Sequence, residues 1–328
     1  MKLISIFIIL KEPGKFRNLP GKEGYNSAEK DHTMKQRLYL LSVIIFLTFF
    51  TSCSSQKETI RLMPLVERQM ALGPRTPGSE AHAAFISDTV ALLEEAGWQV
   101  RSEAEKYQGR TVRNIVADKG AEDSPRWIVL GAHFDCRIAA DQEKQAGDQA
   151  KAVPGANDGA SGVAVLLGLA QTLPEIPDTR VTLAFFDAED QGRIMGWSDW
   201  CLGSRLLAEQ YGALERKPDA VIIADMIGDK DLNVYRERNS DKTLTDQLFT
   251  LAGKLRLGKQ FINEEKFTMY DDHVPFIEQG IPAADLIDFD YPWWHTLEDT
   301  ADKLSEESLQ AVYRLLYAYV TGELRIKN

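Results

Sequence analysis

The sequence predicts a three-layer α/β/α domain with a central, mostly parallel mixed β-sheet. Short apolar runs typical of buried strands alternate with segments of helical periodicity, and no internal repeat or linker interrupts the alternation. The chain has 328 residues, of which 44% are hydrophobic and 27% charged, so it is long enough and apolar enough to bury a large core. This composition excludes a disordered protein.

Capping and turn residues delimit the expected elements. Ser79 is a helix N-cap residue, Gly97 ends the helix that follows it, and the Gly/Pro-rich segment 73–78 separates this helix from an earlier one. The expected helices cover residues 58–72, 79–96, 159–173, 204–211, 244–255 and 305–324. The expected strands cover residues 98–104, 112–117, 127–130, 180–186, 220–224 and 282–287. A polar loop at 137–157 is too long to be a simple connection.

The first 57 residues lie outside the predicted domain. Residues 38–50 form an apolar run that is shorter than the roughly 20 residues of a membrane-spanning helix. Basic residues precede the run and small residues follow it, as in a secretory signal, and the cysteine at position 53 resembles the lipidated cysteine of a bacterial lipoprotein. An uncleaved signal anchor is the alternative.

This pattern divides the chain into four parts. We interpret residues 1–33 as an upstream extension, because Met34 fits the start of the signal. We interpret residues 34–53 as a lipoprotein signal peptide, residues 54–57 as a tether and residues 58–328 as one domain. We expect an exported protein that is anchored in the bacterial cell envelope through a lipid on Cys53 and contacts the membrane in no other way.

The net charge of the predicted domain indicates which kinds of ligand it can bind. Residues 1–53 contain 8 of the 38 basic and 4 of the 49 acidic residues, so the remaining chain carries a formal charge of −15. Such a surface repels nucleic acid and favours neutral or cationic ligands, including a peptide amino group.

Side chains suited to metal binding follow the predicted strands. They are His133, the Glu189–Asp190 pair, Asp225 and His295, while Asp158 comes just before a helix. Ligands collect at the carboxyl ends of the strands in folds of this class. Taken one at a time, each side chain could be a helix cap, a surface acid or a satisfied polar residue. Their shared position at the strand ends favours a metal site instead.

Histidine nitrogen and carboxylate oxygen are typical zinc ligands, and a catalytic zinc keeps one position open. The sequence therefore predicts a catalytic zinc site. The carboxylates of Asp135 and Asp187 could hold the His133 imidazole or orient a loop. His82 lies within a helix and shows no ligand pattern, so it is interpreted as structural.

Five motifs carry a family resemblance: HFD, GANDGASG, FFDAED, DMIG and DDHVPF followed by WWH. They resemble the zinc exopeptidase family that includes bacterial aminopeptidases and animal-type glutaminyl cyclases, and the similarity extends from residue 73 to residue 324. The resemblance implies a zinc exopeptidase-like fold and a first zinc on Asp158, Asp190 and His295. It also implies a general base at Glu189. In the aminopeptidases, the residues matching His133 and Asp225 hold a second zinc, which Asp158 bridges.

Three residues favour a cyclase over a peptidase. Asp271 stands where aminopeptidases usually carry a small hydroxyl residue, and it can share a proton with Asp225 if the two are close. Trp197 and Trp294 match tryptophans that form the walls of a small substrate pocket in cyclases. Asp271 could instead cap a helix, and either tryptophan could be ordinary packing.

The resemblance thus implies a glutaminyl-peptide cyclotransferase. Such an enzyme cyclises the N-terminal glutamine of peptides or proteins to pyroglutamate and releases ammonia, with one zinc and Glu189 as base. A two-zinc aminopeptidase is the alternative, and a non-enzymatic anchored domain ranks last because the ligand set is intact. Pairing of Cys136 with Cys201 is left open, since two free buried thiols fit the sequence equally well.

Overall fold

The computed structural model describes residues 60–324. The predicted signal peptide, the lipidation of Cys53 and the tether lie outside the described residues. The described residues belong to one compact unit. No helix within this range is both long enough and apolar enough to cross a membrane.

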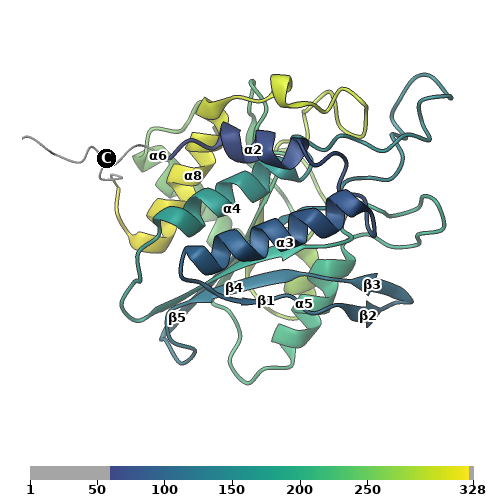
Figure 1. The fold of residues 1–328 in the computed structure, drawn as a ribbon. Helices are drawn as coiled ribbons and strands as arrows, with labels where there is room; N and C mark the ends of the chain where they lie inside the picture. The colour runs from purple at the N-terminus through teal and green to yellow at the C-terminus, as the bar shows by residue number, and fades with distance from the viewer. Residues whose placement is uncertain (1–59, 325–328) are drawn as a thin grey trace, which may run out of the picture. The chain divides into compact units, whose positions relative to one another are not determined.

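A six-stranded sheet forms the centre of the fold, and it confirms the predicted mostly parallel mixed sheet (Figure 1). Four neighbouring strands run parallel to one another. At one edge of the sheet, the next strand pairs antiparallel with these four, and the outermost strand pairs antiparallel with that one. Its strands, in spatial order, are β1 (Gln99–Arg101), β4 (Ile115–Lys119), β6 (Thr179–Phe186), β5 (Arg126–His133), β7 (Ala220–Asp225) and β10 (Ala283–Ile287).

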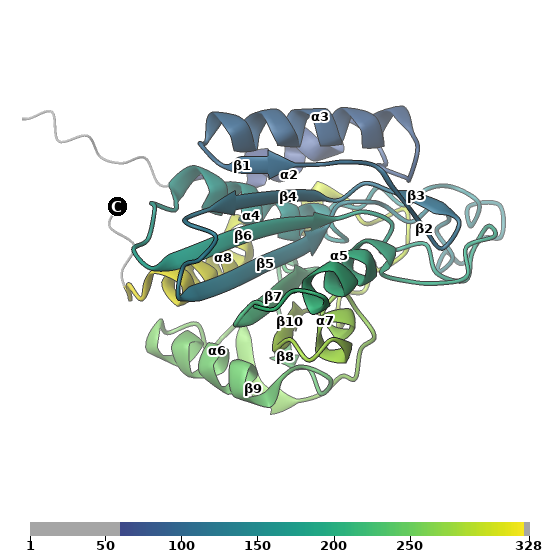
Figure 2. The same ribbon diagram turned by 90° about the horizontal axis from the view of Figure 1, so that it is seen from below.

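Helices cover both faces of the sheet, which completes the three layers (Figure 2). One face shares the large hydrophobic core with α2 (Met63–Met70), α3 (Glu80–Glu95), α4 (Ala160–Thr172), α6 (Lys242–Lys254) and α8 (Glu306–Thr321). The other face packs against α5 (Leu202–Gly212) and α7 (Val274–Glu278) through a second, smaller core. The apolar runs in β5, β6 and β7 are continuous because these strands are buried on both faces.

The predicted capping residues act as expected at the second helix. Ser79 Oγ accepts a hydrogen bond from the backbone N–H of His82 at 3.1 Å, which satisfies a free donor in the first turn of α3. Gly97 follows the helix with a φ of +79°, a conformation that glycine adopts without strain. The first helix is shorter than predicted, because α2 begins only at Met63, with a proline in its first turn.

One predicted strand is divided in two. Residues 112–117 were expected to be continuous, but Val112 ends β3 (Arg110–Val112) and β4 starts at Ile115. The backbone N–H of Arg113 donates to Asp187 at 2.8 Å, and Asn114 donates to the Gly203 carbonyl at 2.8 Å. These contacts take the backbone out of the sheet between the two strands.

Short elements with little apolar pattern were missed. They are β2 (Glu105–Tyr107), which pairs with β3, the parallel pair β8 (Val234–Arg236) and β9 (Phe261–Glu265), and the 3₁₀ helix η1 (Ala301–Lys303). Most of their residues are exposed or half-buried, so no alternation of buried and exposed side chains marks them.

Candidate metal centre and active site

The predicted first-zinc ligands meet at the carboxyl edge of the parallel strands. One ligand atom from each of Asp158, Asp190 and His295 lies within 4.8 Å of the others, and all three residues are buried. His295 Nε2 is 3.0 Å from Asp190 Oδ1 and 3.8 Å from Asp158 Oδ2. Asp190 follows β6 and His295 follows β10, so the parallel strands bring together residues that are far apart in the sequence.

Unpartnered polar atoms show that this group fits a cation. Asp158 Oδ2, Asp190 Oδ2 and His295 Nε2 are buried and lack a hydrogen-bond partner. A buried polar atom without a partner costs about 1–3 kcal/mol, and more if it is charged. One nitrogen and two carboxylate oxygens are a ligand set that suits zinc, so a bound cation would satisfy all three atoms at once.

A second group shares Asp158. His133 Nε2 is 3.0 Å from Asp158 Oδ1 and 3.1 Å from Asp225 Oδ1, and these residues also form a set that could hold a metal ion. In this group His133 Nε2 and Asp225 Oδ1 already form a hydrogen bond. In the second group, one nitrogen and one oxygen are therefore already satisfied by a shared proton.

The backbone around Asp158 is held tightly. The Asp299 carboxylate accepts hydrogen bonds from the backbone N–H groups of Asn157 at 2.8 Å and Asp158 at 3.3 Å. Position 159 must be glycine, because a Cβ there would lie 2.3 Å from the His133 carbonyl oxygen. The GANDGASG motif thus places Asp158 against the end of β5.

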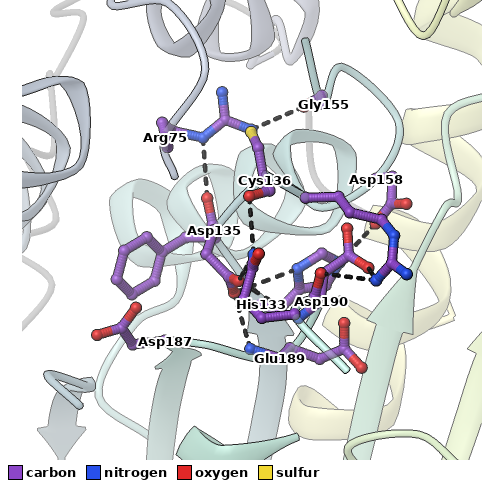
Figure 3. Close-up of polar contacts among 12 residues, drawn as sticks. Arg75, His133, Asp135, Cys136, Gly155, Asp158, Asp187, Glu189 and Asp190 are labelled. Atoms are coloured by element: carbon purple, nitrogen blue, oxygen red, sulfur yellow. Dashed lines mark hydrogen bonds and ion pairs between the residues drawn. The ribbon is translucent and has the colours of Figure 1, made fainter. Parts of the chain in front are cut away.

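Asp135 supports the segment that carries Glu189, the predicted general base (Figure 3). Its carboxylate accepts from the backbone N–H groups of Glu189 at 3.0 Å and Asp190 at 3.3 Å, and from the Gln191 side chain at 2.8 Å. His133 Nδ1 is 3.7 Å from Asp135 Oδ1. Asp135 therefore orients the loop, and it lies close to the imidazole without a hydrogen bond to it.

The long loop 137–157 supplies two residues that the sequence did not single out. Asp141 Oδ1 lies 2.9 Å from His295 Nδ1, so the imidazole can donate through Nδ1 and keep the Nε2 lone pair for a metal. Arg137 is buried and donates to Asp141 at 2.7 Å and to the Asp190 carbonyl at 3.0 Å. The loop thus fixes two of the three predicted ligands.

Two tryptophan rings stack on the His295 imidazole. Trp294 stacks on the imidazole with ring centroids 3.7 Å apart, and Trp200 stacks at 6.1 Å with an interplanar angle of 13°. Trp197 lies under the Arg110 guanidinium, 4.1 Å from the ring centroid, and packs against Leu202. Trp294 thus lies beside a predicted ligand, but the pocket roles of Trp294 and Trp197 stay predictions. The contact of Trp200 with His295 was missed.

Burial changes the acidity of the carboxyl groups. Burial raises the pKa of Glu189 well above its ordinary value, and the charges of Asp271 and Asp190 add to this, although His133 opposes it. Burial and then the charge of Asp225 raise the pKa of Asp271 to about 7. Burial and the neighbouring carboxylates also raise the pKa of Asp225. Of these carboxyl groups, Asp271 can therefore hold and exchange a proton near neutral pH.

Four further residues considered in the sequence, namely His82, Asp187, Cys136 and Cys201, lie outside the proposed ligand set. His82 Nε2 is 2.7 Å from Asp187 Oδ1, which agrees with the interpretation of His82 as a structural residue. Asp187 also accepts from the backbone N–H of Arg113, so it contacts neighbouring segments rather than His133. Cys136 and Cys201 are both buried and free, so no disulfide joins them.

Comparison with known proteins places this arrangement in a family. The sequence profile of peptidase family M28 matches residues 114–320. The structure is similar to that of Tannerella forsythia glutaminyl cyclase, with 30% identity, a TM-score of 0.73, and coverage of 80% of this chain and 98% of that one. It is also similar to a Zn-dependent exopeptidase from Parabacteroides distasonis, with 27% identity, a TM-score of 0.74, and coverage of 80% and 97%. The glutaminyl-peptide cyclotransferase of Boiga irregularis is 26% identical over 301 residues, which cover 80% of this chain and 79% of that protein.

Proposed function

The chain belongs to peptidase family M28, and within that family we propose that it is a glutaminyl-peptide cyclotransferase. It would convert the N-terminal glutamine of peptides or proteins to pyroglutamate and release ammonia. The observation that carries the proposal is the 30% identity, over four fifths of this chain, to a bacterial protein described as a glutaminyl cyclase. The buried carboxyl of Asp271 beside Asp225, absent from the aminopeptidase pattern, supports it.

One zinc on Asp158, Asp190 and His295 fits the contacts better than two. Asp158 Oδ2, Asp190 Oδ2 and His295 Nε2 in this group have no hydrogen-bond partners, whereas His133 and Asp225 already bond to each other. A bound zinc would act as a Lewis acid toward the γ-carbonyl of the substrate glutamine. We therefore propose one bound zinc ion per chain.

Glu189 is the proposed general base. Burial raises the pKa of Glu189, which strengthens it as a proton acceptor, and the Asp135 carboxylate accepts a hydrogen bond from its backbone N–H. Glu189 accepts a proton from the α-amine, whose nitrogen attacks the γ-carbonyl carbon. The bond from that carbon to the amide nitrogen then breaks, and Glu189 returns the proton to the departing ammonia. The nucleophile belongs to the substrate, so proximity supplies part of the acceleration.

Asp225 and Asp271 are the proposed auxiliary acids. The charge of Asp225 helps to raise the pKa of Asp271 to about 7, so one proton can be kept on the pair at neutral pH. The protonated carboxyl can donate a hydrogen bond to the departing amide nitrogen, while Glu189 supplies the proton that leaves with ammonia. Trp294 packs beside the metal ligands and forms one wall for the glutamine side chain, and we keep Trp197 as a second proposed wall.

The alternative is a two-zinc aminopeptidase. The observation in its favour is the second potential metal group, His133, Asp158 and Asp225, together with the similarity to a Zn-dependent exopeptidase. In that enzyme Glu189 would activate water instead of the substrate amine.

Two assays on the zinc-loaded protein distinguish the two functions. Peptides with N-terminal glutamine are tested for ammonia release, and leucine and alanine arylamides are tested for hydrolysis. The proposal expects ammonia release with negligible arylamide turnover. Arylamide hydrolysis without ammonia release would overturn it. Metal analysis is a second measurement, and two tightly held zinc ions per chain would favour the peptidase.

We also propose that the protein is exported and anchored in the cell envelope by a lipid on Cys53. The support is the pattern of basic, apolar and small residues that ends at this cysteine. The mass of the mature N-terminus tests the proposal. A mature protein that begins at Cys53 and carries a diacylglyceryl group is expected, and an unmodified or uncleaved N-terminus would contradict it.

A further inference from the structure

A buried thiol contacts the proposed general base. Cys201 Sγ lies 3.2 Å from Glu189 Oε1, and both residues are buried. A thiol is a hydrogen-bond donor and a carboxylate is an acceptor, so the S–H group donates to Glu189. Two backbone hydrogen bonds bring these segments together, from Cys201 N–H to the Glu189 carbonyl at 2.9 Å and from Leu202 N–H to the Ala188 carbonyl at 3.1 Å.

The backbone at Cys201 adopts an uncommon conformation. Cys201 precedes α5 with a φ of 59° and a ψ of 37°, in the left-handed region that disfavours residues other than glycine. The residue holds the N-cap position, but its side chain makes no cap hydrogen bond and contacts Glu189 instead. Strain of this kind persists only where surrounding contacts enforce it, and it is common at active sites.

A second donor from the same helical turn follows the same pattern. Ser204 Oγ donates to the buried carboxylate of Asp272. Glu189, Cys201 and Asp272 form one close group. The first turn of α5 therefore offers two neutral donors to two buried carboxyl groups. Of these two, Glu189 is the one assigned to the chemistry.

A neutral donor suits this position. Burial, and then the nearby carboxylates of Glu189 and Asp272, raise the pKa of the Cys201 thiol well above its ordinary value, so the thiol keeps its proton. A lysine or arginine at this place would form an ion pair and lower the pKa of Glu189, which would weaken it as a base. A neutral thiol orients the carboxylate at a smaller cost in basicity than a cation would.

We propose that Cys201 is a positioning residue whose thiol holds Oε1 of Glu189 and leaves Oε2 to accept the proton from the substrate. This inference rests on the proposed function, because it takes Glu189 as the base. It concerns the orientation of Glu189 and not substrate binding. A defect should therefore appear in kcat and leave KM unchanged.

Four variants of the zinc-loaded protein test the proposal. Cys201→Ala and Cys201→Val remove the donor; the valine variant also fills the site, but it places a β-branched side chain in the left-handed backbone of Cys201, so the alanine variant is the decisive one. Cys201→Ser keeps a donor. Cys136→Ala is the matched control, because it truncates the other buried free cysteine, whose Sγ contacts the Pro154 carbonyl rather than Glu189.

The expected result is a fall in kcat of about 10-fold in the alanine and valine variants, the size of effect of one hydrogen bond to a charged group, with KM within about two-fold. Cys201→Ser should retain at least roughly a third of wild-type kcat, and Cys136→Ala should match wild type. A melting curve on each variant separates lost folding from lost rate.

Two outcomes would overturn the role of Cys201. One is wild-type kcat in a folded alanine or valine variant, and the other is a serine variant as slow as the alanine variant. Failure of the proposed function looks different, because wild-type protein would then release no ammonia from glutamine peptides. In that case the same comparisons on arylamide hydrolysis decide the role of Cys201, since Glu189 is the base in both reactions.

Discussion

Replacing Asp141 should weaken zinc binding although Asp141 is not itself a proposed ligand. Its carboxylate lies 2.9 Å from His295 Nδ1, on the side of the ring opposite the metal group. A hydrogen bond to a charged group contributes about 1.5–3 kcal/mol, equivalent to roughly 10- to 100-fold in affinity. Because the Asp141 side chain is 32% exposed, water replaces part of the contact, and the lower end of that range is expected.

The assay is competition for zinc between metal-free protein and a chromophoric chelator. Asp141→Ala should raise the zinc dissociation constant by about 10-fold, in line with the effect of other residues that support metal ligands. Asp148→Ala is the matched control, since Asp148 lies in the same loop, has a side chain that is 28% exposed, and pairs with Lys151 instead of a ligand. An Asp141→Ala affinity within about two-fold of wild type would show that His295 is oriented without this carboxylate.

Three further predictions concern the base, the effect of pH on metal binding, and acid stability. Glu189→Gln should lose roughly 100-fold or more of kcat in the ammonia assay while zinc content is unchanged, because it removes the proton acceptor. Burial lowers the pKa of His295, but the carboxylates of Asp190, Asp141 and Asp158 outweigh this and raise it to about 9. Zinc affinity should therefore increase from neutral pH toward about 9, with proton release detectable by calorimetry in buffers of different ionisation enthalpy; a pH-independent affinity would contradict this. Burial alone would raise the pKa of Glu237. The His273 imidazole and three backbone N–H groups that donate to its carboxylate outweigh burial, and together they lower this pKa from 4.5 to about 2. Its folded-state pKa is depressed, so its contribution of roughly 3 kcal/mol is fully present above about 4.5 and is lost as the pH falls toward about 2. Urea unfolding of wild type and Glu237→Gln should show a stability difference that shrinks over this interval.

The sequence predicted that the proposed ligand side chains meet, because position along a parallel strand is informative. Every strand of the parallel part ends at the same edge of the sheet, so a residue directly after a buried apolar run must lie at that edge. Asp190 and Asp225 could be placed by this rule before any contact was known. His295 follows β10 by eight residues, and its family motif rather than its spacing identified it.

The supporting residues were not predictable in the same way. The loop that contains Asp141 has other acidic residues, and nothing in the sequence distinguishes Asp141 from them. Only the folded loop shows that Asp141, and not Asp148, contacts His295. The choice between Trp197 and Trp200 depends on a short segment in which Arg193 and Met195 have positive φ angles. Such turns at residues other than glycine leave no pattern in the sequence. Loop conformation therefore limits what the sequence can predict here.

Charge balance connects the proposed single zinc with the extra carboxyl of Asp271. The buried centre contains the carboxyl groups of Asp158, Asp190, Asp225, Glu189 and Asp271, against the imidazoles of His133 and His295. Five ionised carboxylates cannot share one buried region without cations or protons, because each charge raises the pKa of its neighbours. An aminopeptidase can balance such a centre with two zinc ions. With one zinc, protons must take the place of the second ion, and Asp271, with a pKa of about 7, is suited to carry one of them. Asp271 is therefore the residue whose role depends most directly on the metal count, and Asp271→Ser, which restores the hydroxyl of the aminopeptidase pattern, should make a second zinc bind more tightly.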